Sequence, residues 1–430
     1  MLGWTPDVAA KRGAVSQTES RTGRIMLGIE RTYTLLRTKI QYPHLVNPAP
    51  QTNVPGPQFL PPVAVKKARP PSNARSRIVV QPPRLFPLKA LLLTAPSQLD
   101  YTNFAAPTPG DDEVLLRIHA CGICGSDIHG WDGSTGRRRP PLIMGHEASG
   151  EIVAVGPRVE RWRAGDRVTF DSTIYCGACP YCTRGEVNLC DNRRVVGVAP
   201  VEYRQHGAFA ELLALPARIL YALPPGLTYQ QAAMVEPVSI AIHAVQRVKL
   251  APNSTAVVIG AGMIGLFVVQ ALKWAGATRI IAADLADNRL ALARELGATD
   301  TLRSDLVDVP AEVARLTGGG AEVALEVVGL SATVNLAIAS VRRGGHVVLV
   351  GNLAPKIDFP LQAVVTRELT LHGTCGSAGE YPLCLDLIAR GVIRVEPMIS
   401  AVAPLADGAA WFEKLSAKDG AKFMKVILTP

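Results

Sequence analysis

Residues 257–271 read VVIGAGMIGLFVVQA, and this stretch determines the fold of the second half of the chain. An apolar run typical of a buried strand is followed by Gly260, Gly262 and Gly265, and then by a segment with helical spacing. In a G-x-G-x-x-G pattern the first glycine makes the turn, the second admits a pyrophosphate and the third packs helix against strand. The N-terminus of the following helix then faces the phosphates. The stretch therefore predicts a dinucleotide site.

The sequence around this motif alternates between strands and helices from about residue 241. The strand-like runs are STAVVIG, RIIAAD, AEVALEVVG and GGHVVLVGN, with helical segments between them. This alternation predicts a parallel, doubly wound sheet, and hence an α/β protein.

Asp284 ends the second of these strands, nineteen residues after Gly265. A carboxylate at this place accepts hydrogen bonds from the ribose hydroxyls and repels a 2′-phosphate, which favours NAD over NADP. Arg289 instead favours NADP, because a guanidinium group tolerates the additional phosphate.

The chain before residue 241 has the pattern of an all-β unit. Short aliphatic or β-branched runs are separated by Gly, Pro and Asp: KALLLT, DEVLLRIHA (112–120), ASGEIVAVG (148–156) and DRVTF (166–170). At the far end, LCLDLIARGVI and DGAAWFEKLSA predict two helices, and AKFMKVILT predicts a closing strand.

The net charge of +9 comes from the first 88 residues. They carry 13 Lys and Arg against three acidic residues, whereas the rest carries 32 against 33. They also hold 13 of the 33 prolines, so we expect a disordered leader over 1–88. Such a leader is a transit peptide, a basic interaction arm or an over-long start without a role in the chemistry.

The rest of the composition restricts location and partners. No apolar run approaches the roughly 18 residues that span a bilayer, and the first residues lack the apolar block of a secretory signal. The even charge balance beyond the leader gives no reason to expect nucleic acid as a partner. We therefore expect a cytoplasmic protein that binds neither membrane nor nucleic acid.

Four cysteines lie in the stretch CGACPYCTRGEVNLC, at residues 176–190. Paired disulfides are the alternative, but nothing indicates secretion, and cysteines this close in sequence make poor structural bridges. Four thiolates in a loop rich in Gly and Pro suit a closed tetrahedral zinc site. The sequence predicts a structural zinc bound by Cys176, Cys179, Cys182 and Cys190, and this ion performs no chemistry.

Two further fragments predict a second, open metal site. CGICGSDIHG contains Cys124, and MGHEASG contains His146 followed by Glu147. A thiolate, an imidazole and a carboxylate are the ligand types of a catalytic zinc that keeps one position open. Cys121 is interpreted as a core residue.

From about residue 89 to 430 the chain resembles the zinc-containing medium-chain dehydrogenases, the superfamily of alcohol and polyol dehydrogenases. The resemblance is carried, in order, by CGICGSDIH, GHEASG, GDRVTF, the four-cysteine loop, EPVSIAIHAV and GAGMIG. It implies that Cys124 and His146 are zinc ligands. Where alcohol dehydrogenases have a third cysteine, this chain has Glu236, as in the sorbitol, threonine and butanediol branches. There Glu147 is a ligand and Glu236 binds directly or through water; the alternative for Glu236 is a carboxylate at a helix start.

The resemblance also implies an architecture. A GroES-like β catalytic domain at 89–240 is rejoined by 378–430 around a Rossmann domain at 241–377, and the active site lies in the cleft between them. Family members usually form homo-dimers or homo-tetramers. Ile264 is expected to contact the cofactor, and Val350 and Gly351 to lie near the nicotinamide.

These parts predict transfer of a hydride between a secondary alcohol and NAD, with zinc lowering the pKa of the alcohol. Ser126 is suited to receive the alcohol proton, and His129 titrates in the range needed to pass it outward. The alternative is that the two are a turn hydroxyl and a surface imidazole.

The substrate is predicted to be a polyol or sugar alcohol, because two carboxylates near the metal can bind an adjacent hydroxyl group. Arg137, Arg138 and Arg139 could bind the phosphate of a compound such as galactitol 1-phosphate, or could simply form a solvated loop. L-threonine 3-dehydrogenase and 2,3-butanediol dehydrogenase are alternatives. Other classes are a zinc-free reductase and a non-catalytic NAD-binding relative.

Overall fold

The computed structural model describes residues 88–417, 420 and 422–430. The leader predicted for 1–88 lies outside the described residues except for its last residue, Leu88. That residue begins strand β1.

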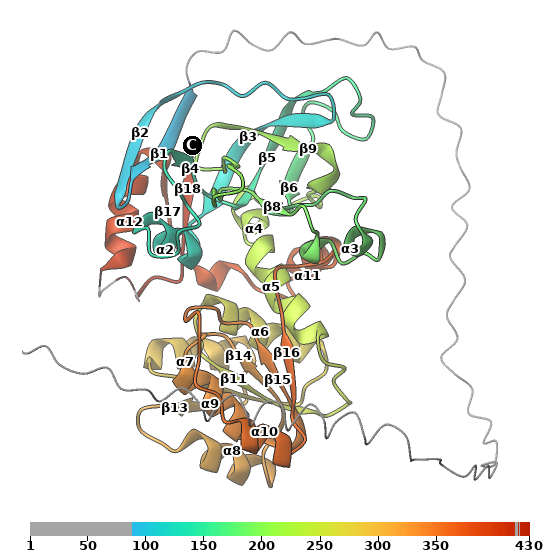
Figure 1. Cartoon of the computed structure of the whole chain (residues 1–430), viewed down its shortest axis with the longest axis vertical. Coiled ribbons are helices and arrows are strands. Elements are labelled where there is room, and N and C mark those ends of the chain that lie inside the picture. Colours follow the sequence, from blue (N-terminus) through green and yellow to red (C-terminus); the bar gives the residue numbers. More distant parts are fainter. Residues whose placement is uncertain (1–87, 418–419, 421) are drawn as a thin grey trace, which may run out of the picture. The chain divides into compact units, whose positions relative to one another are not determined.

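The nucleotide-binding half is built on a six-stranded parallel sheet (Figure 1). The strand order is β13-β12-β11-β14-β15-β16, which is the Rossmann order 3-2-1-4-5-6 when β11 is counted first. The register places Val257 opposite Ile281 and Ala324. The bounds are β11 (Thr255–Ile259), β12 (Arg279–Asp284), β13 (Asp300–Arg303), β14 (Ala321–Glu326), β15 (Val341–Leu349) and β16 (Thr370–Gly373).

The other half contains a mostly antiparallel seven-stranded sheet in the order β10-β6-β5-β3-β18-β17, with β9 also paired to β3. The closing strand predicted near the end of the sequence is β18, which lies between β3 and β17. The bounds are β3 (Glu113–Gly122), β5 (Glu147–Val155), β6 (Arg167–Phe170), β9 (Leu212–Pro216), β10 (Leu220–Ala222), β17 (Ile399–Pro404) and β18 (Lys425–Thr429).

Two small sheets complete this half. One has the order β2-β1-β4, and the other pairs β7 with β8 beside the cysteine-rich loop. Their bounds are β1 (Leu88–Ala95), β2 (Gln98–Phe104), β4 (Leu142–Ile143), β7 (Thr173–Ile174) and β8 (Arg194–Val195). The α/β fold class, with a β-rich domain and a Rossmann domain, is thereby confirmed, while the domain boundaries stay a prediction.

Helices connect and cover these sheets. In the β-rich half they are α2 (Gly125–Trp131), α3 (Pro180–Thr183), α4 (Tyr229–Ala233), α11 (Tyr381–Ala389) and α12 (Gly408–Ser416). In or beside the Rossmann half they are α5 (Val235–Gln246), α6 (Met263–Trp274), α7 (Asp287–Leu296), α8 (Val309–Thr317), α9 (Ser331–Ser340) and α10 (Leu361–Thr366).

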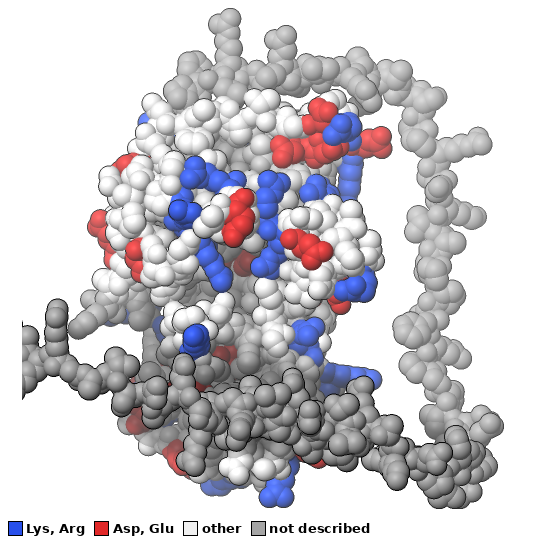
Figure 2. Space-filling model, viewed as in Figure 1, with Lys and Arg blue, Asp and Glu red and all other residues white. Residues whose placement is uncertain are grey.

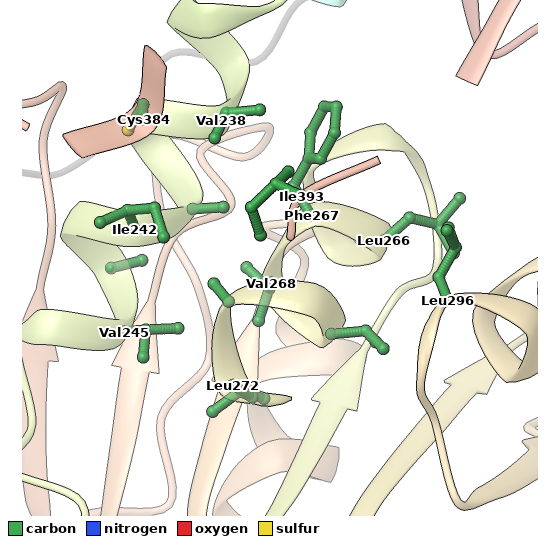
Figure 3. Close-up of a cluster of buried hydrophobic side chains, with 14 of the residues drawn as sticks. Val238, Ile242, Val245, Leu266, Phe267, Val268, Leu272, Leu296, Cys384 and Ile393 are labelled. Carbon is green, nitrogen blue, oxygen red and sulfur yellow. The ribbon is translucent and has the colours of Figure 1, made fainter. Parts of the chain in front are cut away.

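The largest apolar core lies around α5, α6 and α11. Figure 3 shows Val238 and Ile242 of α5 with Phe267 of α6 and Cys384 of α11 in one cluster. The same core includes Ala120 of β3 and Leu325 of β14, so residues of both large sheets contribute to it. A shared core of this kind links the β-rich half to the Rossmann half.

The surface of the described chain agrees with its even charge balance. Figure 2 shows basic and acidic side chains interspersed on one face, with uncharged surface between them. In the described part of the chain, no helix has both the length and the apolar character needed to cross a bilayer.

Candidate metal centre and cofactor site

The structure brings together three residues from the two fragments that predict an open metal site. The ligand atoms of Cys124, His146 and Glu147 all lie within 4.8 Å of one another. The pairing of β3 with β5 explains this, because it places Gly122 opposite Glu147 and so sets the chain leading to Cys124 beside His146.

Asp127 organises two of these three residues. Its buried carboxylate accepts a hydrogen bond from the Cys124 backbone N–H at 3.1 Å, and its Oδ1 lies 3.4 Å from His146 Nδ1. Burial alone would raise the pKa of Asp127. The neighbouring charges of His146 and Arg138 outweigh burial and hold that pKa well below its usual range. An ionised Asp127 therefore faces the Nδ1 side of the imidazole ring, although the two atoms form no hydrogen bond in this structure, and Nε2 is left for another partner.

Glu147 has one paired and one unpaired oxygen. Oε2 accepts a hydrogen bond from the Lys425 ammonium group, and neither side chain is exposed. Oε1 is buried and has no hydrogen-bond partner among the described residues. A buried carboxylate oxygen without a partner, beside a thiol and an imidazole, fits a divalent metal ion such as zinc.

Glu236 stands at the edge of this group. It lies in the first turn of α5, where its side chain is largely withdrawn from water, and it accepts a hydrogen bond from Ser172 Oγ at 3.4 Å. Burial raises its pKa to about 7, and the nearby Glu147 carboxylate adds to the shift. Glu236 is not one of the residues whose ligand atoms lie within 4.8 Å of one another. Glu236 therefore has features of both interpretations of the sequence: it lies at the start of a helix, and it lies near the three residues of the metal site.

Ser126 and His129 are exposed on α2 directly after Cys124. Residues three apart in a helix lie on one face, so their side chains are neighbours. A cavity of about 450 Å³ opens beside His129. It is lined by Cys124, His129 and Asp132, by Arg289 of α7, and by residues near the end of the chain such as Leu415 and Phe423.

The four cysteines of the loop 176–190 also converge. Cys176 Sγ lies 3.9 Å from Cys182 Sγ, and Cys179 Sγ lies 3.5 Å from Cys182 Sγ. Four sulfurs around one zinc, each bonded at about 2.3 Å, are about 3.8 Å apart. Backbone N–H groups of Ala178 and Cys179 donate to Cys176 Sγ and lower its pKa to about 6. All eight cysteines belong to the described residues and none is in a disulfide, so the loop fits a closed zinc site.

The glycine-rich turn has the predicted close contacts. Gly260 has φ +99°, and a Cβ atom on Gly265 would come within 1.9 Å of the Gly260 carbonyl oxygen. Ile264 lies in the first turn of α6. Only glycine lets the helix approach the strand this closely.

The remaining predicted cofactor residues lie at the carboxyl ends of the central strands. Asp284 accepts a hydrogen bond from the Ala261 N–H at 2.7 Å, and Arg289 Nη1 lies 3.8 Å from the same carboxylate. Val350 and Gly351 donate backbone hydrogen bonds to the Glu326 carbonyl oxygen at 2.8 and 3.0 Å. In a doubly wound sheet this edge binds the cofactor.

The arginine run at 137–139 contains one buried and two exposed side chains. Arg138 is only 7% exposed, and its guanidinium group donates to Asp127 Oδ1 and to Ser126 Oγ. Arg138 itself is therefore neither solvated nor available to bind a phosphate. Arg137 and Arg139 are exposed, because alternate residues of this extended segment point in opposite directions.

Two groups near the metal site were missed in the sequence: Lys425 and the ion pair of Arg138 with Asp127. Lys425 lies 278 residues from Glu147, and its one sequence signal is a lysine placed within the apolar run MKVILT. Asp127 lies in the quoted motif CGSDIH, but nothing in the sequence indicates that Arg138 is its partner.

Comparison with known proteins places this site in a family. Residues 110–225 match the family described as alcohol dehydrogenase GroES-like domain, and residues 264–390 match zinc-binding dehydrogenase. The chain belongs to the zinc-containing medium-chain dehydrogenases, in the branch of the polyol dehydrogenases. Members of this family are enzymes that use zinc and a nicotinamide cofactor, so the predicted enzyme class and cofactor types are confirmed.

Individual relatives cover most of the described chain. Sorbitol dehydrogenase of Bacillus subtilis (strain 168) is 35% identical over 319 residues, which are 73% of this chain and 89% of the relative. D-arabitol-phosphate dehydrogenase of Enterococcus avium is 33% identical, over 76% of this chain and 93% of the relative. A zinc-binding dehydrogenase of Sinorhizobium meliloti 1021, solved bound to NADP, has a TM-score of 0.75 and 32% identity, covering 80% of this chain and all of the other.

Proposed function

We propose that this protein is a zinc-dependent polyol dehydrogenase that transfers a hydride between NAD and a secondary hydroxyl group of its substrate. The observation that carries the proposal is the convergence of Cys124, His146 and Glu147 within 4.8 Å, with one buried carboxylate oxygen left unpartnered. Of these residues, Cys124 borders a cavity that is also lined by Arg289, from the half of the chain that carries the glycine-rich turn.

Cys124, His146 and Glu147 would hold the catalytic zinc, with Glu236 binding it directly or through water. When bound, zinc acts as a Lewis acid that makes the substrate alcohol more acidic. Asp127 keeps His146 in one orientation, and Lys425 keeps Glu147 in place. Cys176, Cys179, Cys182 and Cys190 would bind the second zinc, which stabilises their loop.

Ser126 and His129 would carry the proton that the alcohol loses. Ser126 accepts that proton while its own hydroxyl proton passes toward His129, three residues further along α2. His129 is exposed and can release the proton to water. A bound nicotinamide cofactor would supply the hydride acceptor, which is the cofactor's own chemistry.

NAD is the proposed cofactor, bound over Gly260, Gly262, Ile264 and Gly265, with Val350 and Gly351 near the nicotinamide. A carboxylate at Asp284 favours the two free ribose hydroxyls and opposes a 2′-phosphate. Arg289 lies 3.8 Å from that carboxylate and favours NADP. The ratio of kcat/KM for NAD and NADP, in the native protein and in Asp284→Ser, measures this balance.

An unphosphorylated polyol is the proposed substrate class. Sorbitol dehydrogenase is among the relatives, but so is D-arabitol-phosphate dehydrogenase. The burial of Arg138 against Asp127 argues against a phosphate at the arginine run, because that guanidinium is already engaged.

Assembly and location are also part of the proposal. The outer strand β16 and the exposed apolar side chains Leu353, Phe359, Leu361 and Val365 support a homo-dimer or homo-tetramer. We place the protein in the cytoplasm. Light scattering on the purified chain measures the assembly, and cell fractionation measures the location.

The test is a panel of sorbitol, galactitol 1-phosphate, threonine and 2,3-butanediol with NAD and NADP, before and after treatment with a zinc chelator. We expect the highest kcat/KM with sorbitol and NAD, and loss of turnover when zinc is removed. Elemental analysis should find zinc in both sites. Full activity after complete metal removal, or zinc in the cysteine loop alone, contradicts the proposal.

A further inference from the structure

We infer that Arg138 is a positioning residue for the proton transfer in this active site, because it holds Ser126 and Asp127 in one fixed arrangement. Its Nη2 donates to Ser126 Oγ at 2.9 Å and to Asp127 Oδ1 at 3.1 Å, and its Nε donates to the same Oδ1 at 3.2 Å. One guanidinium thus links the hydroxyl group proposed to accept the proton with the carboxylate that orients His146. The inference rests on the proposed function.

The surroundings of Arg138 allow only this placement. The side chain is 7% exposed, and its stem passes directly over Gly130, where a Cβ atom would lie 2.0 Å from Arg138 Cδ. Its backbone forms a bridge with Ala199. The guanidinium group forms an ion pair with the fully buried Asp127. Breaking this pair would leave a buried charge without a counter-charge, so the ion pair holds Arg138 in place.

The contact with Ser126 fits the needs of a proton relay. A guanidinium group only donates hydrogen bonds and does not lose its proton, so Arg138 occupies one lone pair of Ser126 Oγ and takes no part in the transfer. The hydroxyl keeps its own proton and a second lone pair. Ser126 accepts the alcohol proton on that lone pair and releases its own proton toward His129, which gains the one proton that the alcohol loses.

The first test replaces Arg138 and compares it with its exposed neighbour. Arg138→Met and Arg138→Lys are assayed in single-turnover NADH formation with the preferred polyol, alongside the matched control Arg139→Met. We expect the rate constant to fall by about tenfold to a hundredfold in Arg138→Met. The reason is that a displacement of a reacting group by about 1 Å can lower the rate by up to about a hundredfold. KM and zinc content should stay near those of the native protein, and Arg139→Met should show the native rate.

Arg138→Lys also serves if Arg138→Met does not fold, because lysine keeps the charge beside Asp127. A single ammonium group cannot reproduce the forked pattern, so the rate should still fall. An unchanged rate in Arg138→Lys contradicts the inference. A rate that falls only in proportion to lost zinc also contradicts it, because Arg138 would then act on the metal ligands alone.

A double-mutant cycle with Ser126→Ala separates this inference from the proposed function. If Arg138 acts through Ser126, Arg138→Lys should cause little further loss in the Ser126→Ala background. Equal fold losses in both backgrounds overturn the role of Arg138 and leave the relay intact. A native rate in Ser126→Ala overturns the relay of the proposed function itself.

Discussion

At the scale of single residues, buried charges dominate the region below the metal site. Lys425 donates to Glu147 and, at 2.9 Å, to the Ile123 carbonyl oxygen, and it is withdrawn from water. Burial would lower the pKa of Lys425, but the carboxylate of Glu147 outweighs burial and raises it. Lys425 therefore keeps its charge, and this buried charge depends on the partner oxygen of Glu147.

Removal of this lysine should destabilise the protein. In the zinc-free protein, Lys425→Met leaves the Glu147 carboxylate buried without its counter-charge, and we expect the free energy of unfolding to fall by about 3–5 kcal/mol. Urea unfolding of both proteins after removal of zinc measures the loss. Lys414→Met is the control. The Lys414 side chain is exposed, and its ammonium group lies over the rings of Trp411 and Phe423. Equal losses in the two variants would contradict the assignment.

A second residue-scale prediction concerns pH. Burial raises the pKa of Asp171 from 3.8 to about 7. The folded state therefore binds this proton more tightly than the unfolded state, so its contribution to stability is present at low pH and is lost as pH rises from about 4 to 7. Asp171→Asn should remove this slope and stabilise the protein at pH 8 by on the order of 4 kcal/mol.

Unfolding free energies of the native protein and Asp171→Asn, measured between pH 4 and pH 8, test this prediction. The difference between the two proteins removes the contribution of titrating groups that do not interact with Asp171. Parallel curves over the whole range would show that the buried carboxyl group does not titrate as described.

At the scale of elements, the cysteine-rich loop between β7 and β8 depends on its metal for shape. Its helix α3 has only four residues, too few to be stable alone, and the loop meets the rest of the chain through Asn188, which donates to the Cys375 carbonyl oxygen at 2.7 Å. In this segment, metal binding by the four cysteines therefore supplies the stability that an apolar core supplies elsewhere.

Cys182→Ser should remove zinc from this loop, leave the ion at Cys124 and His146, and lower the melting temperature. Elemental analysis and thermal unfolding measure the two effects. Cys375→Ser is the matched control, because Cys375 is exposed and lies outside the cluster. Loss of zinc from both sites in Cys182→Ser, or loss of zinc in Cys375→Ser, would contradict the separation of the two sites.

The elements also show what the sequence reveals and what it does not. The run VVI before Gly260 became β11, and Asp284 ends β12 as expected, because buried strands and tight turns leave strong local patterns. The partner of Arg138 depends on which face of an extended segment points inward, and residues 137–139 carry the same charge. Lys425 meets Glu147 only through sheet pairing across 278 residues, which no local pattern contains.

At the scale of the whole described chain, one apolar core joins the two halves. Val238 and Ile242 of α5 pack with Phe267 of α6 and Cys384 of α11, where the chain passes from one half to the other (Figure 3). Tyr381 of α11 belongs to the same core. His243 Nδ1 and Glu380 Oε1, 2.6 Å apart, add a polar contact at the same crossing. We expect the two halves to unfold together.

Ile242→Ala tests this coupling. Ile242 is fully buried, so its truncation leaves a cavity and should cost about 2–5 kcal/mol. Calorimetry should show one transition at a lower temperature for both halves. Val402→Ala, at a half-exposed position, should change the melting temperature little. Two separated transitions in the native protein would contradict a shared core.

The place of β18 within its sheet has a consequence for biosynthesis. On the ribosome the glycine-rich turn and its parallel strands are completed by residue 373, and that half can form as soon as it emerges. The β-rich half is translated first but lacks an inner strand until residues 425–429 appear. β9 pairs with the Glu113–Arg117 part of β3 early, but the Cys121–Gly122 end of β3 has no partner on the β18 side until the last residues of the chain emerge. The β-rich half, which is translated first, is therefore the last to complete its sheet.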